Sequence, residues 1–475
     1  MSKLNINELF LYRHRFFIGY CLIGLGLITV LLFAGLYTPG GLSKQEMQSV
    51  VTSSAITKDS INSFSIANLP YHFLQKASLA VFGISILSIK LPSIILAFFS
   101  AIGIVLLLRR WFKPYVGVLA SLIAISTGQF IFFAQDGTPS IIYIFWAVWL
   151  MLLSSLIIRK EKYKIVYIIA FYIAAALSLY TPLSIYALIA LVGSIVLHPH
   201  LRFLIKSLSK IKIIIGISVA IILISPLILS IINTPKLAFD LLGIPTHWPN
   251  LIDNIILLRS EYFGFTNPGG STLTTPFFEL GSMMIVAVGI YYVIKNRVTS
   301  KNYVIILWTV CIIPIVILNP GFTSVTFLPI VLLLASGLHT LLSHWYELFP
   351  KNPYARIGGL IPLTILISVL VFSGADRYIY GYNYDPNVAS SFSKDLKFVT
   401  TGAKDLVVTN EEFAFYSVVA KYNKFITVST NPNTDIFWAS KGAKKNFPGY
   451  TIDKIQTSSV AIDGDRFYLY KKSVN

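Results

Sequence analysis

Two short polar stretches hold the side chains best suited to chemistry in this sequence. The first is Ser43-Lys44-Gln45-Glu46, which follows a long apolar run and the turn residues Pro39-Gly40-Gly41. A carboxylate such as Glu46, held at the outer mouth of a membrane cavity, can act as general base on an acceptor hydroxyl. The same four residues also fit the S-x-x-E capping box of a helix amino terminus. Both interpretations of Glu46 stay open.

The second stretch is Gln135-Asp136-Gly137-Thr138-Pro139, in a turn between two apolar runs. Asp136 is the second candidate catalytic carboxylate, and Gln135 is a candidate substrate contact. The alternative is structural, because Asp136 or Thr138 can cap the next helix and Pro139 suits its first position.

Two further groups are candidates for substrate binding. Asn68, Tyr71 and Lys76 begin a short apolar segment, where a lysine could bind a lipid-linked phosphate. A lone lysine there could equally extend its amine to the lipid head groups. A long polar loop supplies His247, Arg259 and Tyr262, in which arginine suits phosphate and the aromatic rings suit sugar stacking. The alternative for this loop is ordinary surface.

The composition is that of a membrane protein. Of the 475 residues, 55% are hydrophobic and only 12% are charged, whereas soluble domains carry roughly 25% charged residues. Both cysteines, Cys21 and Cys311, lie in apolar runs, so we interpret neither as a metal ligand nor as part of a disulfide. We predict no bound metal from the residues alone.

The apolar runs predict about eleven membrane spans, each near 20 residues long. The expected spans are 16–36, 91–108, 115–133, 141–158, two short helices within 165–197, 213–232, 277–294, 303–318, 325–342 and 357–372. The two short helices separate at Tyr180-Thr181-Pro182, where proline interrupts the helix. The segment 70–82 is too short to cross and is expected to lie at the membrane interface.

The basic residues indicate the orientation of the chain. The net charge of +18 comes largely from clusters at alternate ends of the apolar runs, at 3–15, 109–113, 159–164, 202–212, 295–301 and 351–356. Such clusters mark the cytoplasmic side. The amino terminus is therefore expected in the cytoplasm, while Glu46, Asp136 and the carboxyl-terminal region are expected outside. This distribution argues against a nucleic-acid partner.

A change of composition near Asp376 predicts a division into residues 1–375, the membrane domain, and 376–475, a small outer domain. Helices are expected at 395–398 and 411–421, and strands at 405–409, 424–428 and 466–470. Alternating strands and helices indicate an α/β domain. The predicted fold is thus an α-helical polytopic membrane protein with a small carboxyl-terminal α/β extracytoplasmic domain.

Several motifs make the chain resemble the GT-C membrane glycosyltransferases, the broad group that holds the dolichyl-phosphate-mannose–protein mannosyltransferases and the bacterial lipid A aminoarabinose transferase. The motifs are Phe82-Gly83, Lys90-Leu91-Pro92-Ser93 (usually Arg-Leu-Pro-Ser in the family), Leu108-Arg109-Arg110-Trp111-Phe112, Gly117-Val118-Leu119-Ala120 and Gln135-Asp136. The resemblance covers about the first 200 residues by motif, and the later spans by layout.

The resemblance implies an inverting transfer of sugar from a polyprenyl-phosphate donor to an acceptor hydroxyl on a glycan, lipid or protein, at the outer face of a bacterial cytoplasmic membrane. Membrane lipids would surround the chain, and a divalent cation could accompany the lipid phosphate. The family typically carries Asp-Glu in the first outer loop, with the aspartate as catalytic carboxylate, where this chain has Gln45-Glu46. Asn68-Leu69-Pro70 and Asp136-Gly137-Thr138 also depart from the family pattern.

Two other functions remain open at this point. A non-catalytic relative that binds lipid-linked glycans would explain Gln45 in place of an aspartate. A transporter or lipid flippase is disfavoured, because coupled transporters usually place ionisable groups near the middle of the bilayer. The expected spans contain almost none, and Glu279 lies near an outer end.

Overall fold

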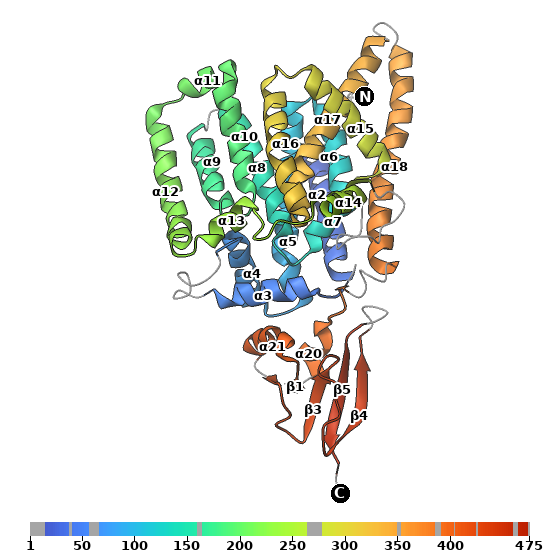
Figure 1. Ribbon diagram of the computed structural model, residues 1–475. Helices are drawn as coiled ribbons and strands as arrows, with labels where there is room; N and C mark the ends of the chain where they lie inside the picture. The colour runs from blue at the N-terminus through green and yellow to red at the C-terminus, as the bar shows by residue number, and fades with distance from the viewer. Residues whose placement is uncertain are drawn as a thin grey trace, which may run out of the picture.

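The apolar runs form a bundle of helices, and a small sheet lies at one end of that bundle (Figure 1). The computed structural model describes residues 15–37, 40–56, 66–158, 164–263, 278–348, 353–384, 391–402, 404–423, 426–458 and 464–473. The long helices of the bundle are α2 (Arg15–Tyr37), α5 (Ile86–Trp111), α8 (Ser140–Ile158), α9 (Lys164–Ser178), α10 (Ser184–Leu197), α12 (Lys210–Asn233), α15 (Leu280–Lys295), α16 (Ser300–Leu318), α17 (Phe327–Leu348) and α18 (Pro353–Tyr384).

Within the described residues, six helices are long and apolar enough to cross a membrane, or up to eight if two bent pairs each form one span. Three shorter apolar helices lie at Gly24–Tyr37, Lys164–Ser178 and Leu280–Lys295. A chain with this content is an integral membrane protein. The count of eleven stays a prediction, because it requires the three shorter helices to cross as well.

Two predicted segments differ in the structure. The expected span 115–133 is broken into α6 (Pro114–Ser126) and α7 (Gly128–Gln135), which meet at a 60° bend. Thr127 causes the break by serving as N-cap of α7, where its hydroxyl accepts from the Phe130 N–H. The expected loop 233–275 contains α13 (Lys236–Leu242) and α14 (Leu251–Phe263), and its residues 264–275 lie outside the described chain. The predicted break at Tyr180-Thr181-Pro182 is confirmed, because it separates α9 from α10.

Two amphipathic helices cover one end of the bundle. They are α3 (Lys44–Ala55) and α4 (Leu69–Phe82), and Figure 1 places them between the bundle and the sheet. The opposite end carries the short helix α11 (Pro199–Lys206). Because α3 and the α7–α8 turn meet at the same end, residues far apart in the sequence come together there.

The carboxyl-terminal region folds as a five-stranded mixed sheet with two helices. Its strands follow the order β2-β1-β3-β5-β4, with bounds β1 (Asp405–Val407), β2 (Thr427–Ser429), β3 (Ile436–Ser440), β4 (Tyr450–Thr457) and β5 (Arg466–Lys472). The helices are α20 (Leu396–Gly402) and α21 (Asn410–Tyr422). The expected elements appear within a few residues, but the sequence prediction missed β3 and β4. Lys424 and Phe425 of one expected strand lie outside the described residues, and the proposed boundary at 375/376 falls inside α18.

The sheet region is attached to the bundle beside α3. The Leu42 N–H donates to the Lys394 carbonyl at 2.9 Å, and the Lys394 N–H donates back to Leu42 at 3.3 Å. One hydrophobic core continues from Leu42 and Val50 into Val419 and Phe467. The loop that leads into α3 is therefore held from both sides.

Candidate active site

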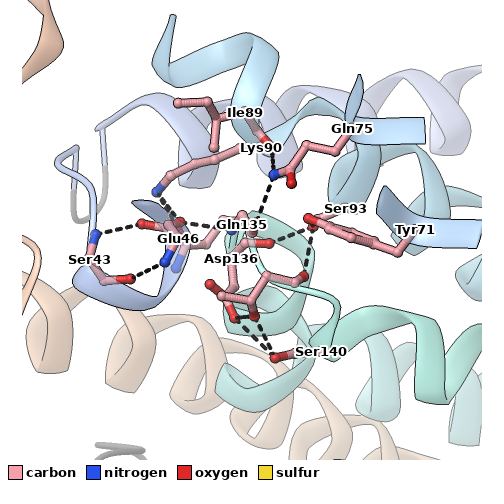
Figure 2. Close-up of polar contacts among 12 residues, drawn as sticks. Ser43, Glu46, Tyr71, Gln75, Ile89, Lys90, Ser93, Gln135, Asp136 and Ser140 are labelled. Atoms are coloured by element: carbon pink, nitrogen blue, oxygen red, sulfur yellow. Dashed lines mark hydrogen bonds and ion pairs between the residues drawn. The ribbon is translucent and has the colours of Figure 1, made fainter. Parts of the chain in front are cut away.

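Glu46 lies at the centre of a buried polar cluster on the α3 end of the bundle (Figure 2). Its Oε2 accepts from the Ser43 N–H at 2.8 Å, and its own N–H donates to Ser43 Oγ at 3.1 Å. This is the capping box that the sequence allowed. Its Oε1 accepts from the Gly137 N–H at 2.7 Å. Both carboxylate oxygens are thus occupied, and the side chain is 0% exposed.

Lys90 supplies the positive charge beside Glu46. Its Nζ lies 3.5 Å from Glu46 Oε1 and donates to Gln135 Oε1 at 2.7 Å, and the whole side chain is buried. The Phe392 ring, from the segment before α20, lies 5.6 Å from this ammonium. A buried cation needs such a partner, because an unpaired charge in a protein interior is strongly destabilising. The ion pair between Glu46 and Lys90 therefore joins α3 to α5, and the hydrogen bond from Lys90 to Gln135 joins α5 to the end of α7.

The second carboxylate, Asp136, has a different environment. Its Oδ2 accepts from the Thr138 hydroxyl and from Ser140 Oγ, the latter at 3.1 Å. Its Oδ1 makes no hydrogen bond within the described part of the chain, and the residue as a whole is buried, with 5% exposed. Asp136 therefore retains an oxygen that can accept a proton.

Asp136 lies in the turn between α7 and α8, outside the spans. Its burial and, next, repulsion from Glu46 raise the pKa of its carboxyl to about 7. The Thr138 and Ser140 hydroxyls and the Lys90 charge oppose this shift. A carboxyl whose pKa is close to neutral is suited to general acid–base catalysis.

Gln75 organises the surroundings of the two carboxylates, and the sequence prediction missed it. Its Nε2 donates to the carbonyls of Ile89 at 3.1 Å and Gly137 at 2.9 Å. Its Oε1 accepts from the hydroxyls of Ser49 at 2.9 Å and Ser53 at 2.6 Å. These two serines are four residues apart on α3 and so share one face. That spacing was the only local signal of this contact.

Gly137 permits the close approach of the turn to α3 and α5. A Cβ placed on Gly137 would lie 2.9 Å from Ile89 Cγ2 and 3.2 Å from Glu46 Oε1. Any side chain would therefore push the turn away from the Glu46 carboxylate. The closeness of these groups explains why Gly137 follows Asp136.

The structure brings together Glu46, Asp136 and Gln135 among the residues predicted for the site. Gln45 is exposed on α3 beside Glu46. Tyr71 is fully buried and its hydroxyl lies 2.8 Å from Ser93 Oγ, which donates to the Asp136 carbonyl. Tyr71 thus supports the Asp136 turn from within the core.

Two more predicted residues hold α4 in place. The Lys76 ammonium donates to the Ile56 carbonyl at the end of α3. Asn68 adopts a left-handed conformation before α4, and its N–H donates to the Tyr180 carbonyl at 2.7 Å. The Lys76 side chain and the Asn68 backbone thus have structural contacts, and a role of either side chain in substrate binding stays a prediction.

The residues predicted from the long loop lie elsewhere. His247 and Arg259 are exposed, and neither contacts the Glu46 cluster within the described part of the chain. Tyr262 lies with its hydroxyl 2.5 Å from Thr326 Oγ1, on the 3-10 helix η3 (Pro320–Thr326). Its neighbour Glu261, from the same loop, is buried. Among the described residues, no group of three or more His, Cys, Asp or Glu side chains could hold a metal ion.

A helical bundle with two helices in its first loop is the arrangement expected from the resemblance to the GT-C membrane glycosyltransferases. The comparisons with known proteins confirm this resemblance. Residues 69–229 match the family model described as dolichyl-phosphate-mannose-protein mannosyltransferase. A comparison with curated protein sequences found no match.

Solved structures of known transferases share the fold over nearly the whole chain. ArnT from Cupriavidus metallidurans in the apo state superposes with a TM-score of 0.51 at 10% identity, and ArnT bound to undecaprenyl phosphate superposes with 0.52 at 11%. Both comparisons cover 95% of this chain and 98% of ArnT. The Archaeoglobus fulgidus oligosaccharyltransferase gives 0.50 at 11% identity, over 85% of this chain and 64% of the archaeal one.

Proposed function

We propose that this protein is a membrane glycosyltransferase that moves a sugar from a polyprenyl-phosphate donor to an acceptor hydroxyl, with Asp136 as the general base. The observation that supports the reaction type is the Oδ1 of Asp136, which accepts no hydrogen bond from the described residues, on a carboxyl with a pKa of about 7. The choice of donor is supported by the shared fold with ArnT, which was solved with undecaprenyl phosphate bound.

In the proposed reaction, the acceptor oxygen attacks the anomeric carbon of the sugar while Asp136 Oδ1 takes the hydroxyl proton. The bond between the anomeric carbon and the phosphate oxygen breaks, and polyprenyl phosphate leaves with both electrons of that bond. Attack opposite to the leaving group inverts the anomeric centre. Fixed donors and charges can stabilise such a transition state without any rearrangement.

Glu46 acts in this proposal as a positioning residue rather than as the base. Its two oxygens already accept from Ser43 and Gly137 and face Lys90, and its side chain is fully buried, so it is poorly placed to take a substrate proton. It holds the Asp136 turn through Gly137, and its charge raises the pKa of Asp136. The base role predicted for Glu46 thereby passes to Asp136.

The pH dependence of transfer should follow the ionisation of Asp136. A general base works only in its deprotonated form, so kcat/KM should rise with pH and level off above about 7. Initial rates measured from about pH 5 to 8.5 should show one ionisation on the acidic limb. A rate that is independent of pH over this range would exclude Asp136 as the base.

The proposed orientation places α3, the cluster and the sheet region outside the cytoplasmic membrane, with the amino terminus inside. It rests on the alternating basic clusters in the sequence. A cysteine introduced at Ser393, which is half-buried next to α20, should react with a membrane-impermeant thiol reagent in intact cells. Labelling that requires permeabilised cells would reverse the assigned orientation.

A non-catalytic role is the second candidate, and one observation favours it. Gln45 is exposed where the related enzymes typically carry an aspartate, and it cannot accept a proton. Gln45→Asp distinguishes the two candidates when each form is assayed with polyprenyl-phosphate sugars. Transfer by the unmodified protein supports the enzyme, whereas transfer that appears only in Gln45→Asp supports the non-catalytic relative.

A further inference from the structure

A cavity of about 430 Å³ lies away from the carboxylate cluster. Its walls come from the carboxyl-terminal ends of α5 and α8, from α9, α10 and α11, and from the beginning of α16. Figure 1 shows α11 at the end of the bundle opposite to α3 and the sheet. The cavity therefore opens at the other membrane face from the candidate active site.

The charged groups at this cavity are positive. Arg110 and Lys301 line it, together with His200, and no Asp or Glu is among its described lining residues. Lys301 is partly buried, and its ammonium lies 4.3 Å from the centre of the Phe112 ring. It forms no ion pair with a carboxylate in the described part of the chain. This concentration of positive charge would attract an anion to the cavity.

The backbone adds further donors at the same place. Thr299 and Ser300, at the beginning of α16, line the cavity beside Lys301. Thr299 makes no side-chain capping bond, so the first N–H groups of this 19-residue helix are not satisfied by its N-cap. Helix amino termini of this kind bind phosphate oxygens well. Lys301, Arg110 and the amino terminus of α16 together offer hydrogen-bond donors and positive charge to a phosphate group.

The remaining walls are apolar. Trp111, Phe171, Leu201 and Ile205 are among the lining side chains. A free inorganic anion would gain nothing from such walls, whereas an acyl chain would be removed from water by them. Arginine suits a phosphate because its guanidinium can bind two phosphate oxygens at once. The positive charge and the apolar walls are therefore both suited to a molecule that carries a phosphate group and an acyl chain.

We propose that this cavity binds an anionic phospholipid of the membrane leaflet at the α11 end of the bundle. Its phosphate would lie against Lys301, Arg110 and the first turn of α16, and its acyl chain would pack on the apolar walls. With the orientation proposed above, this is the cytoplasmic leaflet. The site is separate from the carboxylate cluster, so it does not depend on the proposed transfer reaction.

The test measures lipid binding to the purified full-length chain in a neutral detergent. Dioctanoyl phosphatidic acid is titrated by native mass spectrometry, with dioctanoyl phosphatidylcholine and inorganic phosphate as the comparison ligands. Lys301→Gln should weaken phosphatidic acid binding by at least about tenfold, because it removes a charge-assisted contact. Lys301→Arg should stay within about threefold of the unmodified chain, since it keeps the charge.

Lys295→Gln is the matched control, because Lys295 is exposed in the last turn of α15 and does not line the cavity. It should leave the affinity unchanged. Equal affinities of Lys301→Gln and Lys295→Gln would overturn the site. Inorganic phosphate that binds as tightly as phosphatidic acid would overturn the assignment to a lipid, as would equal affinity for phosphatidylcholine.

Discussion

Replacing Asp136 with asparagine should lower the rate of sugar transfer about 10²–10⁴-fold, the usual contribution of a general base. Asparagine has nearly the same volume and its oxygen can still accept from Thr138 and Ser140. It cannot take a proton from an acceptor hydroxyl. Binding of polyprenyl phosphate and the thermal unfolding temperature in detergent should therefore stay close to the values of the unmodified protein.

Asp240→Asn is the matched control for this substitution, because Asp240 is exposed on α13 and lies outside the cluster. It should transfer sugar at the unmodified rate. If Asp136→Asn also kept that rate, Asp136 would not be the base. A loss of transfer in Glu46→Gln, without loss of stability, would then return the base role to Glu46.

Replacing Lys90 with methionine should destabilise the protein by about 3–5 kcal/mol, because removing one partner of a buried ion pair leaves an uncompensated charge. The uncompensated charge is Glu46, which is 0% exposed and faces Lys90 at 3.5 Å. The methionine would also leave Gln135 Oε1 without its donor. The measurement is the unfolding midpoint in detergent, followed by circular dichroism.

Lys44→Met supplies the matched control, since Lys44 is exposed at the start of α3. It should change the midpoint little. Lys90→Arg should preserve most of the stability, because arginine keeps the positive charge. Glu46→Gln introduced together with Lys90→Met should recover part of the loss by removing the stranded charge. If Lys90→Met were as stable as Lys44→Met, the ion pair would not support the site.

Hydropathy was sufficient to place most of the bundle, because most apolar runs of membrane length form a helix of their own. It was not sufficient at Thr127, where a single capping hydroxyl divides an otherwise continuous apolar run. The strand β4 was missed because its residues are mostly exposed and carry no alternating apolar pattern. The bend at Thr127 and the strand β4 leave no signal in the hydropathy of the sequence, which is the property that the prediction used.

The site itself was only partly predictable. The capping box at Ser43 and Glu46 is a local pattern, and it was recognised as such. The contacts of Glu46 with Lys90 and Gly137 join residues that are distant in the sequence, and no local spacing encodes them. The same holds for Gln75, which connects α3, α5 and the Asp136 turn. Sequence reasoning therefore found the two carboxylates but did not predict the contacts that surround each of them.

The configuration of the product tests the central claim most directly. The purified protein in liposomes is supplied with polyprenyl-phosphate sugars labelled with ¹³C at the anomeric carbon, and with an envelope fraction of the source cells as acceptor. The one-bond carbon–hydrogen coupling of the labelled carbon reports the configuration before and after transfer. We expect a glycoside of inverted configuration, formed in step with release of polyprenyl phosphate. A product of retained configuration, or no labelled product with any donor, would contradict an inverting transferase that uses one carboxylate base.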